Sequence, residues 1–313
     1  MINLYLQLDK SVLTLNTINQ NLIQAEYQVR GGIVIKADEV RKEMESGVKK
    51  PFTHLVAWNI GNPQNLGQLP ITFPREVLSY LYTGIAPEVT SHSTPNTYEY
   101  TNDIKNRAES YKKELKNIES YTYYKGLNIV RQNIANYIIK RDNCETFKED
   151  ILLTNGASGG IKIVLQALLE EKKDTVLVPI PQYPLYSASI MLLGSTLAGY
   201  ELDENDNWSV DIKSLDKAYK EHYDSGHRLK AMVIINPGNP TGNILSEQNI
   251  EDIIKFCYEN KLVILADEVY QNNIYSKTKK FHSFKKVLNK LPFPYNKTIL
   301  FSFHSISKGY LGE

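Results

Sequence analysis

Several features are scarce in this sequence of 313 residues, and each scarcity argues against a class of protein. Its two cysteines, Cys144 and Cys257, cannot form a disulfide framework or a four-thiolate zinc site, and no metal site is expected. Basic and acidic side chains nearly cancel, at a formal net charge of +1. This balance gives no electrostatic reason to expect nucleic acid or an anionic membrane as a partner.

The amino-terminal residues lack the features of a targeting segment. The stretch MINLYLQLDKSVLTLN has neither the basic start nor the long apolar run of a secretory signal or a transmembrane helix. It also lacks the arginines of a mitochondrial address. Since the few cysteines fit a reducing compartment, we predict a cytoplasmic protein without a membrane partner.

Apolar segments of strand length alternate with helical patterns from residue 151 onward. The expected strands are 151–156, 174–181, 231–237, 262–268 and 298–305, and the expected helices are 159–173, 183–194 and 245–261. This alternation predicts an α/β fold with a mostly parallel sheet covered on both faces. Cys257 follows apolar residues at helical spacing and is expected in the core.

The first third of the chain reads differently. A short extended piece and a helix that ends near Gly47 are expected between residues 26 and 50. Two stretches, 58–74 and 86–103, are loop-like because glycine, proline and asparagine are frequent in the first and polar residues in the second.

Polar or aromatic residues follow all five expected strands. They are Asn155 to Ser158, then Gln182 and Tyr183, then the loop NPGNPTG with Asn239, then Asp267 and Tyr270, and finally Ser305 and Lys308. The carboxyl ends of parallel strands share one edge of a sheet, where ligands bind. We therefore expect a single ligand site there.

Each of these features alone also has a simpler interpretation. Ser158 at a helix start could bind phosphate or simply cap the helix. Asp267 could pair with a cationic heterocycle or cap the next segment, and Asn239 could present an amide to a ligand or lie in a stiff turn. Lys308 could be an ordinary exposed lysine or a nucleophile with a lowered pKa that forms a Schiff base.

Taken together, these groups satisfy the requirements of one cofactor. Pyridoxal 5′-phosphate needs a lysine for its aldehyde, a carboxylate for its pyridinium nitrogen, donors for its phenolic oxygen and an anion site for its phosphate. Tyr183 offers an aromatic face for the ring. A nucleotide-binding sheet protein is the weakest candidate, because the sequence has no G-x-G-x-x-G fingerprint.

The motifs NPGNPTG, ADEVY and S-x-SKG, in this order, resemble the fold-type I pyridoxal-phosphate aminotransferases. More narrowly, EYQVRGGIVIKA, GQLPITF, TNGASGGI, PIPQYPLYSA and SKGYLGE resemble the alanine aminotransferase group, from about residue 25 onward. The resemblance implies a three-layer large domain over residues 86–313. It also implies an amino-terminal arm with part of a small domain over residues 1–85.

The resemblance also implies roles for individual residues. Lys308 would hold the cofactor aldehyde, and Asp267 the pyridinium nitrogen. The remaining contacts would be Asn239 and Tyr270 to the phenolic oxygen, Tyr183 over the ring, Ala157, Ser158 and Ser305 to the phosphate, Tyr121 to the phosphate of a neighbouring subunit, and Gly61 to the substrate carboxylate. The implied enzyme is a homodimer that transfers the amino group of L-alanine to 2-oxoglutarate.

This sequence departs from the family pattern at two places. The stretch YTYYKG keeps Tyr121 and Gly126 but lacks the two serines of Y-S-x-S-x-G. The chain also stops soon after Lys308, where relatives continue through an antiparallel sheet strand and most of the small domain. We therefore expect a C-terminally truncated chain with little activity alone. A non-catalytic fragment and another class I/II aminotransferase are the alternatives.

Overall fold

The computed structural model describes residues 13–27, 31–57, 60–83, 99–115 and 121–312. The chain divides into two compact units, each considered by itself. We call residues 1–61 and 155–305 the sheet unit, and residues 62–154 and 306–313 the helical unit. The functional division expected at residue 85 stays a prediction.

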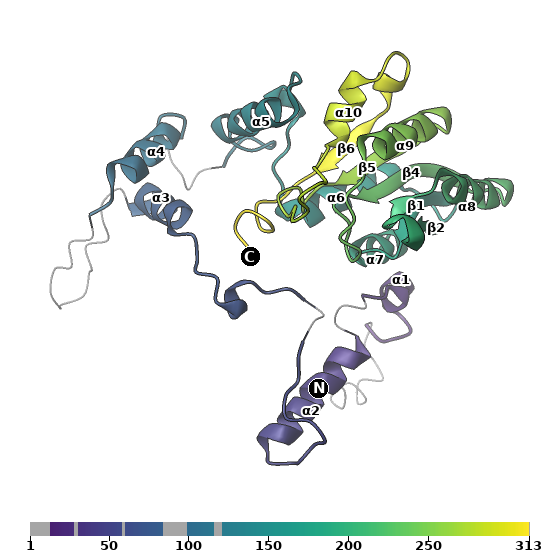
Figure 1. Ribbon diagram of the computed structural model, residues 1–313, viewed down its shortest axis with the longest axis horizontal. Helices are drawn as coiled ribbons and strands as arrows, with labels where there is room; N and C mark the ends of the chain where they lie inside the picture. The colour runs from purple at the N-terminus through teal and green to yellow at the C-terminus, as the bar shows by residue number, and fades with distance from the viewer. Residues whose placement is uncertain (1–12, 28–30, 58–59, 84–98, 116–120, 313) are drawn as a thin grey trace. The chain divides into compact units, whose positions relative to one another are not determined.

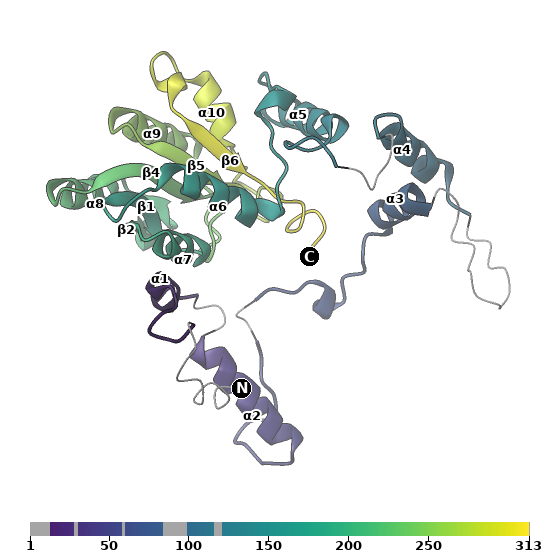
Figure 2. The same cartoon turned by 180° about the vertical axis from the view of Figure 1, so that it is seen from behind.

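The sheet unit is built on a sheet in the strand order β3-β2-β1-β4-β5-β6 (Figures 1 and 2). The strands are β1 Asp174–Ile180, β2 Thr196–Asp203, β3 Ser209–Val210, β4 Arg228–Ile235, β5 Val263–Asp267 and β6 Leu300–Phe303. Every pairing is parallel except that of β2 with the short β3. The prediction of a mostly parallel sheet is confirmed.

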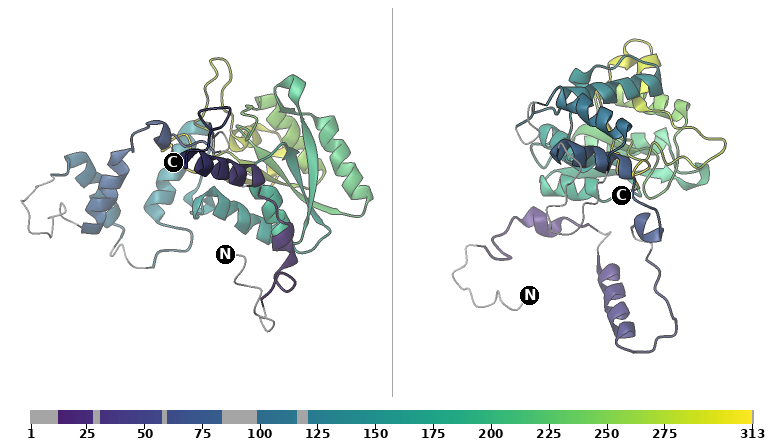
Figure 3. Two further views of the ribbon diagram at one scale, coloured as in Figure 1. Left: turned by 90° about the horizontal axis from the view of Figure 1, so that it is seen from below. Right: turned by 90° about the vertical axis from the view of Figure 1, so that its left-hand side faces the viewer.

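Helices cover both faces of this sheet, which gives the expected three layers (Figure 3). The helices are α6 Gly156–Leu168, α7 Leu185–Leu192, α8 Ile212–Asp224, α9 Glu247–Glu259 and α10 Phe284–Lys290. Side chains alternate along a strand, so Val176 packs with α6 and α7, while Leu177 packs with α8, α9 and α10. Cys257 of α9 is fully buried, as predicted, and burial raises the pKa of its thiol.

Helices dominate the rest of the described chain. The sheet unit also contains α1 Gln20–Gln24 and α2 Gly32–Glu45, and Gly47 follows α2 as expected. The helical unit contains the short 3-10 helices η3 Gln64–Leu66 and η4 Lys148–Asp150, and the helices α3 Thr72–Thr83, α4 Asn102–Lys112 and α5 Asn128–Asp142. Among the residues described, the helices are too short or too polar to cross a lipid bilayer.

One expected strand does not form. Residues 151–154 pair with no strand of the described sheet, and Leu152 is exposed instead of buried. Their backbone is held differently, since the Leu153 N–H donates to the Lys125 carbonyl at 3.0 Å. A strand requires a ladder partner as well as an apolar sequence, and sequence pattern does not report the partner.

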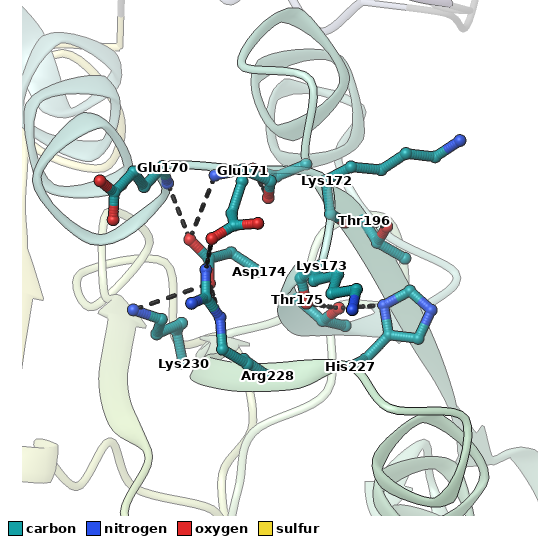
Figure 4. A network of polar contacts seen from close by, with 11 residues as sticks. Glu170, Glu171, Lys172, Lys173, Asp174, Thr175, Thr196, His227, Arg228 and Lys230 are labelled. Carbon is teal, nitrogen blue, oxygen red and sulfur yellow. Dashed lines mark hydrogen bonds and ion pairs between the residues drawn. The ribbon is translucent and has the colours of Figure 1, made fainter.

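A buried polar network joins the amino-terminal ends of β1 and β4 (Figure 4). The carboxylate of Asp174 is fully buried and accepts from the backbone N–H groups of Glu170 and Glu171, at 2.8 and 3.3 Å. Its other oxygen lies 2.8 Å from Nη2 of Arg228 and 3.6 Å from Nζ of Lys230. Burial alone raises the pKa of Asp174, but these donors and cations outweigh it and the pKa is lowered.

Candidate active site

Polar groups gather at the carboxyl edge of the sheet because five parallel strands end there. The strand register places Ile235 beside Asp267 and Asp267 beside Phe303. The Glu268 N–H donates to the Phe303 carbonyl at 2.9 Å, which extends this pairing by one step. The residues that follow β4, β5 and β6 therefore start side by side in the sheet unit.

Asp267 is a buried acid of this edge, with 5% of its surface exposed. Its Oδ2 accepts from the hydroxyl of Tyr186 at 2.7 Å, and its Oδ1 accepts from the Val269 N–H at 3.3 Å. Burial, and then the neighbouring carboxylate, raise the pKa of Tyr186 well above its usual value. Tyr186 therefore keeps its proton and donates it in a hydrogen bond to the Asp267 carboxylate.

The loop after β4 contains Asn239, another of the residues predicted at this edge. Nδ2 of Asn239 donates to the hydroxyl of Tyr270 at 3.4 Å, so the structure brings these two predicted residues together. The loop is tight at Gly238, where an added Cβ would lie 1.9 Å from Oδ1 of Asn243. Asn243 also accepts from the Thr241 hydroxyl at 2.6 Å. This packing fixes the backbone on either side of Asn239.

Tyr183 and Ala157 both pack against the buried cluster on the α6 and α7 face. Sequence reasoning missed a partner of Tyr183, because Tyr27 lies far from it in the chain. The two hydroxyls are 2.5 Å apart, and the rings meet edge to face with centroids 6.1 Å apart. Beside Tyr183, Oε1 of Gln182 is buried without a hydrogen-bond partner among the described residues.

The predicted phosphate ligands lie at the ends of two elements that pack together. Ser158 is exposed in the first turn of α6, and Asn155 precedes this helix without a side-chain cap hydrogen bond. Ser305 is half-buried two residues after β6, whose Phe303 joins the same buried cluster as α6. The start of a helix offers free N–H groups and a favourable dipole to an anion.

The remaining predicted residues, Lys308, Tyr121 and Gly61, lie in other segments of the chain. Lys308 belongs to the helical unit and is half-buried in a turn closed by the Gly312 N–H, which donates to its carbonyl at 2.8 Å. Tyr121, in the same unit, is fully exposed. Gly61 closes the first segment of the sheet unit, and a Cβ added there would meet no described atom within 4 Å.

Comparison with known proteins gives the relationship directly. A sequence model described as "Aminotransferase class I and II" matches residues 94–310. Alanine aminotransferase 1, mitochondrial, of Arabidopsis thaliana is 43% identical, covering 96% of this chain and 55% of that protein. Alanine aminotransferase 1 of Bos taurus is 42% identical, covering 98% and 61%. Glutamate–glyoxylate aminotransferase 1 of Arabidopsis thaliana is 44% identical, covering 95% and 60%.

Solved structures agree. An aminotransferase from Escherichia coli matches with a TM-score of 0.68 at 26% identity, covering 93% of this chain and 58% of that one. An alanine aminotransferase from Pyrococcus furiosus matches with a TM-score of 0.69 at 20% identity, covering 94% and 60%. The fold is that of the fold-type I aminotransferases, and this chain spans 55–61% of the three curated relatives named above. By its motifs, its fold and these matches, the chain belongs to the class I and II aminotransferase family.

Proposed function

We propose that this chain binds pyridoxal 5′-phosphate at the carboxyl edge of the sheet and serves the transamination of L-alanine with 2-oxoglutarate. Aminotransferases of this class are pyridoxal-phosphate enzymes. The observation that carries the proposal is Asp267, a buried carboxylate held by Tyr186 and the Val269 N–H at the end of β5. The products would be pyruvate and L-glutamate.

The donor set of the sheet unit fits this cofactor. Asp267 would hold the pyridinium nitrogen, since a buried anion favours a cationic neighbour. Asn239 and Tyr270, already 3.4 Å apart, would both donate to the phenolic oxygen. Gln182 supports a ligand at this edge, because a buried carbonyl oxygen without a partner destabilises the chain unless a ligand or water donates to it.

Ring and phosphate would be held from the same edge. Tyr183 would lie over the ring, with its hydroxyl bonded to Tyr27. Ala157, Ser158 and Ser305 would bind the phosphate at the start of α6, where the helix dipole favours an anion. Tyr121 would contact the phosphate bound by a second copy, which requires a homodimer, and Gly61 would lie beside the substrate carboxylate.

Lys308 would be the base that moves the substrate proton. Its amine would hold the cofactor aldehyde at rest and, once released by the incoming amino acid, would take the proton from the substrate Cα. When bound, the cofactor supplies an electron sink for the charge left on that carbon. The ionised Asp267 would preserve this property by keeping the ring nitrogen protonated.

Reductive trapping tests the proposal. The purified chain is incubated with pyridoxal phosphate, reduced with borohydride, and analysed for mass added at Lys308. Attachment that is lost in Lys308→Ala and weakened in Asp267→Asn would support the proposed site. A folded chain without attachment would refute the proposal for these 313 residues and would favour the alternative of a non-catalytic fragment. The matched control is Lys279→Ala, which changes an exposed lysine of the sheet unit.

A second amino acceptor has support from the comparisons. Glutamate–glyoxylate aminotransferase 1 is about as similar to this chain as the alanine aminotransferases are. Glyoxylate is therefore the alternative acceptor, and assays with glyoxylate and 2-oxoglutarate at equal concentration distinguish the two. The cytoplasmic location stays a prediction, since the name of one relative includes "mitochondrial".

A further inference from the structure

Arg131 is a buried cation of the helical unit. It lies on α5 with 3% of its surface exposed. Burying a guanidinium is costly unless all sides of the charge find acceptors, and arginine cannot discard its proton in a protein. The position of Arg131 therefore needs an explanation in terms of what it binds.

The guanidinium bridges three short segments. Its Nε donates to the Gly126 carbonyl at 3.2 Å, its Nη1 donates to the Lys148 carbonyl at 2.8 Å, and its Nη2 donates to Oδ1 of Asn128 at 2.5 Å. Its Cζ lies 5.3 Å from the ring centroid of Tyr123. Arg131 thus contacts both ends of the turn that Gly126 closes by donating its N–H to the Tyr123 carbonyl at 2.7 Å.

The acceptors are neutral, which separates this residue from an ordinary ion pair. The salt bridges found among the described residues do not include Arg131. Two of its acceptors are backbone carbonyls, whose positions depend on the path of the chain rather than on a side chain. The planar fork of arginine can serve three such acceptors at once, whereas the single ammonium of lysine lacks that geometry.

Other contacts secure the same turn from the opposite side. Gly126 has φ +96°, and a Cβ there would lie 2.4 Å from Cδ1 of Leu153. The Leu153 N–H donates to the Lys125 carbonyl at 3.0 Å, and Nζ of Lys125 donates to the Glu149 carbonyl at 2.7 Å. The turn is therefore fixed at its base, while Tyr121, two residues before Tyr123, extends fully exposed.

We propose that Arg131 is a positioning residue, which holds the Tyr123–Gly126 turn so that Tyr121 is presented in one orientation. The use of that orientation rests on the proposed function, in which Tyr121 contacts the cofactor phosphate bound by a second copy. Arg131 itself would touch neither cofactor nor substrate. Its effect on cofactor binding would pass through the turn.

Limited trypsin digestion tests the positioning role without any cofactor, because Lys125 lies inside the turn. We compare cleavage after Lys125 in the wild type, Arg131→Gln and Arg131→Lys, read by mass spectrometry. Loss of the three-way bridge should accelerate cleavage there by about tenfold or more in both variants. The matched control is Lys140→Gln, which removes an exposed cation of the same helix. It should leave cleavage after Lys125 within about twofold of the wild type.

Unchanged cleavage in Arg131→Lys would overturn the proposal, since lysine keeps the charge and loses the fork. If Arg131→Gln fails to fold, Arg131→Lys and Asn128→Ala, which removes one acceptor, decide the question in the same assay. If all three variants lose the cooperative unfolding transition followed by circular dichroism, Arg131 stabilises the fold as a whole. That result would overturn the proposed local role.

A pyridoxal-phosphate titration then tests the link to function. If the wild type binds, Arg131→Lys should weaken binding as much as Tyr121→Phe does. Wild-type affinity in Arg131→Lys would overturn the link to the cofactor. A wild type that binds no cofactor would refute the proposed function, and the cleavage assay would still decide the role of Arg131.

Discussion

Replacing Asp174 by asparagine exchanges one carboxylate oxygen for an NH₂ group at the centre of the network in Figure 4. One carboxylate oxygen accepts from the N–H groups of Glu170 and Glu171, and the other faces Arg228 and Lys230. An asparagine has a single acceptor oxygen, so it can serve only one of these sides. The other side would meet an NH₂ group in place of an acceptor.

The expected loss of stability depends on which of the two sets of donors loses its acceptor. A hydrogen bond to a charged acceptor contributes roughly 1.5–3 kcal/mol to stability. A buried donor that loses its acceptor adds a further cost, because it has been removed from water and has no partner. The side chain of Arg228 is 47% exposed, so water can replace part of its pairing, while the carboxylate has no access to water. We therefore expect Asp174→Asn to lower the free energy of unfolding by about 2–4 kcal/mol at pH 7.

The loss should depend on pH in a defined direction. A carboxylate with a lowered pKa in the folded chain contributes stability that is complete above its unfolded pKa, about 3.9, and is lost as the pH falls through the folded pKa. Urea denaturation followed by circular dichroism should show the largest gap between wild type and variant at pH 7. The gap should narrow below about pH 4, where the unfolded chain binds the proton first, until the folded carboxyl is also protonated at its lowered pKa.

The control for this experiment is Asp216→Asn. Asp216 pairs with Lys220 on the exposed face of α8 at 2.6 Å, and both side chains are largely open to solvent. An exposed pair of this kind contributes about 0.2–1 kcal/mol. Equal losses in the two variants, or a gap for Asp174→Asn that does not change between pH 7 and pH 3.5, would refute the reasoning, since burial would then not matter.

Three further predictions concern the sheet unit. Asp267→Asn should weaken pyridoxal-phosphate binding by about 2–5 kcal/mol, measured by titration, with the urea midpoint little changed. Glu268→Gln should instead lower the free energy of unfolding, measured by urea denaturation, by about 1–3 kcal/mol, because the Phe284 N–H donates to the buried Glu268 carboxylate at 2.8 Å. Tyr27→Phe should accelerate amide exchange in α1, measured by mass spectrometry, and leave the sheet unchanged, because it removes the hydroxyl contact with Tyr183.

The sequence predicted those parts of the fold whose signal is local. The apolar segments that became β1, β4, β5 and β6 are bounded by turn residues, and α9 shows helical spacing. β2 escaped prediction because its sequence, TLAGYELD, mixes polar and small residues with apolar ones. It pairs with β1 through the backbone, and Tyr200 there is buried by tertiary packing that periodicity does not reveal.

The candidate site divides in the same way. Asn239, Tyr270 and Asp267 could be predicted because each follows an apolar strand, and parallel strands end at one edge. Tyr186 could not be predicted as the donor to Asp267, because 81 residues separate them and only the packing of α7 on the sheet joins them. Local sequence reports what ends a strand, whereas the hydrogen-bond partners come from elsewhere in the fold.

The pleat of β5 explains why two adjacent acids have hydrogen-bond partners on opposite faces of the sheet. Asp267 turns toward the α7 face and meets Tyr186, whereas Glu268 turns toward the α10 face and meets the Phe284 N–H and the Ser302 hydroxyl. Successive side chains of a strand point to opposite faces, so the two neighbouring carboxylates bond to different helices of the sheet unit. Glu268 therefore bonds the end of β5 to α10 and β6, while Tyr186 and the Val269 N–H hold the carboxylate of Asp267.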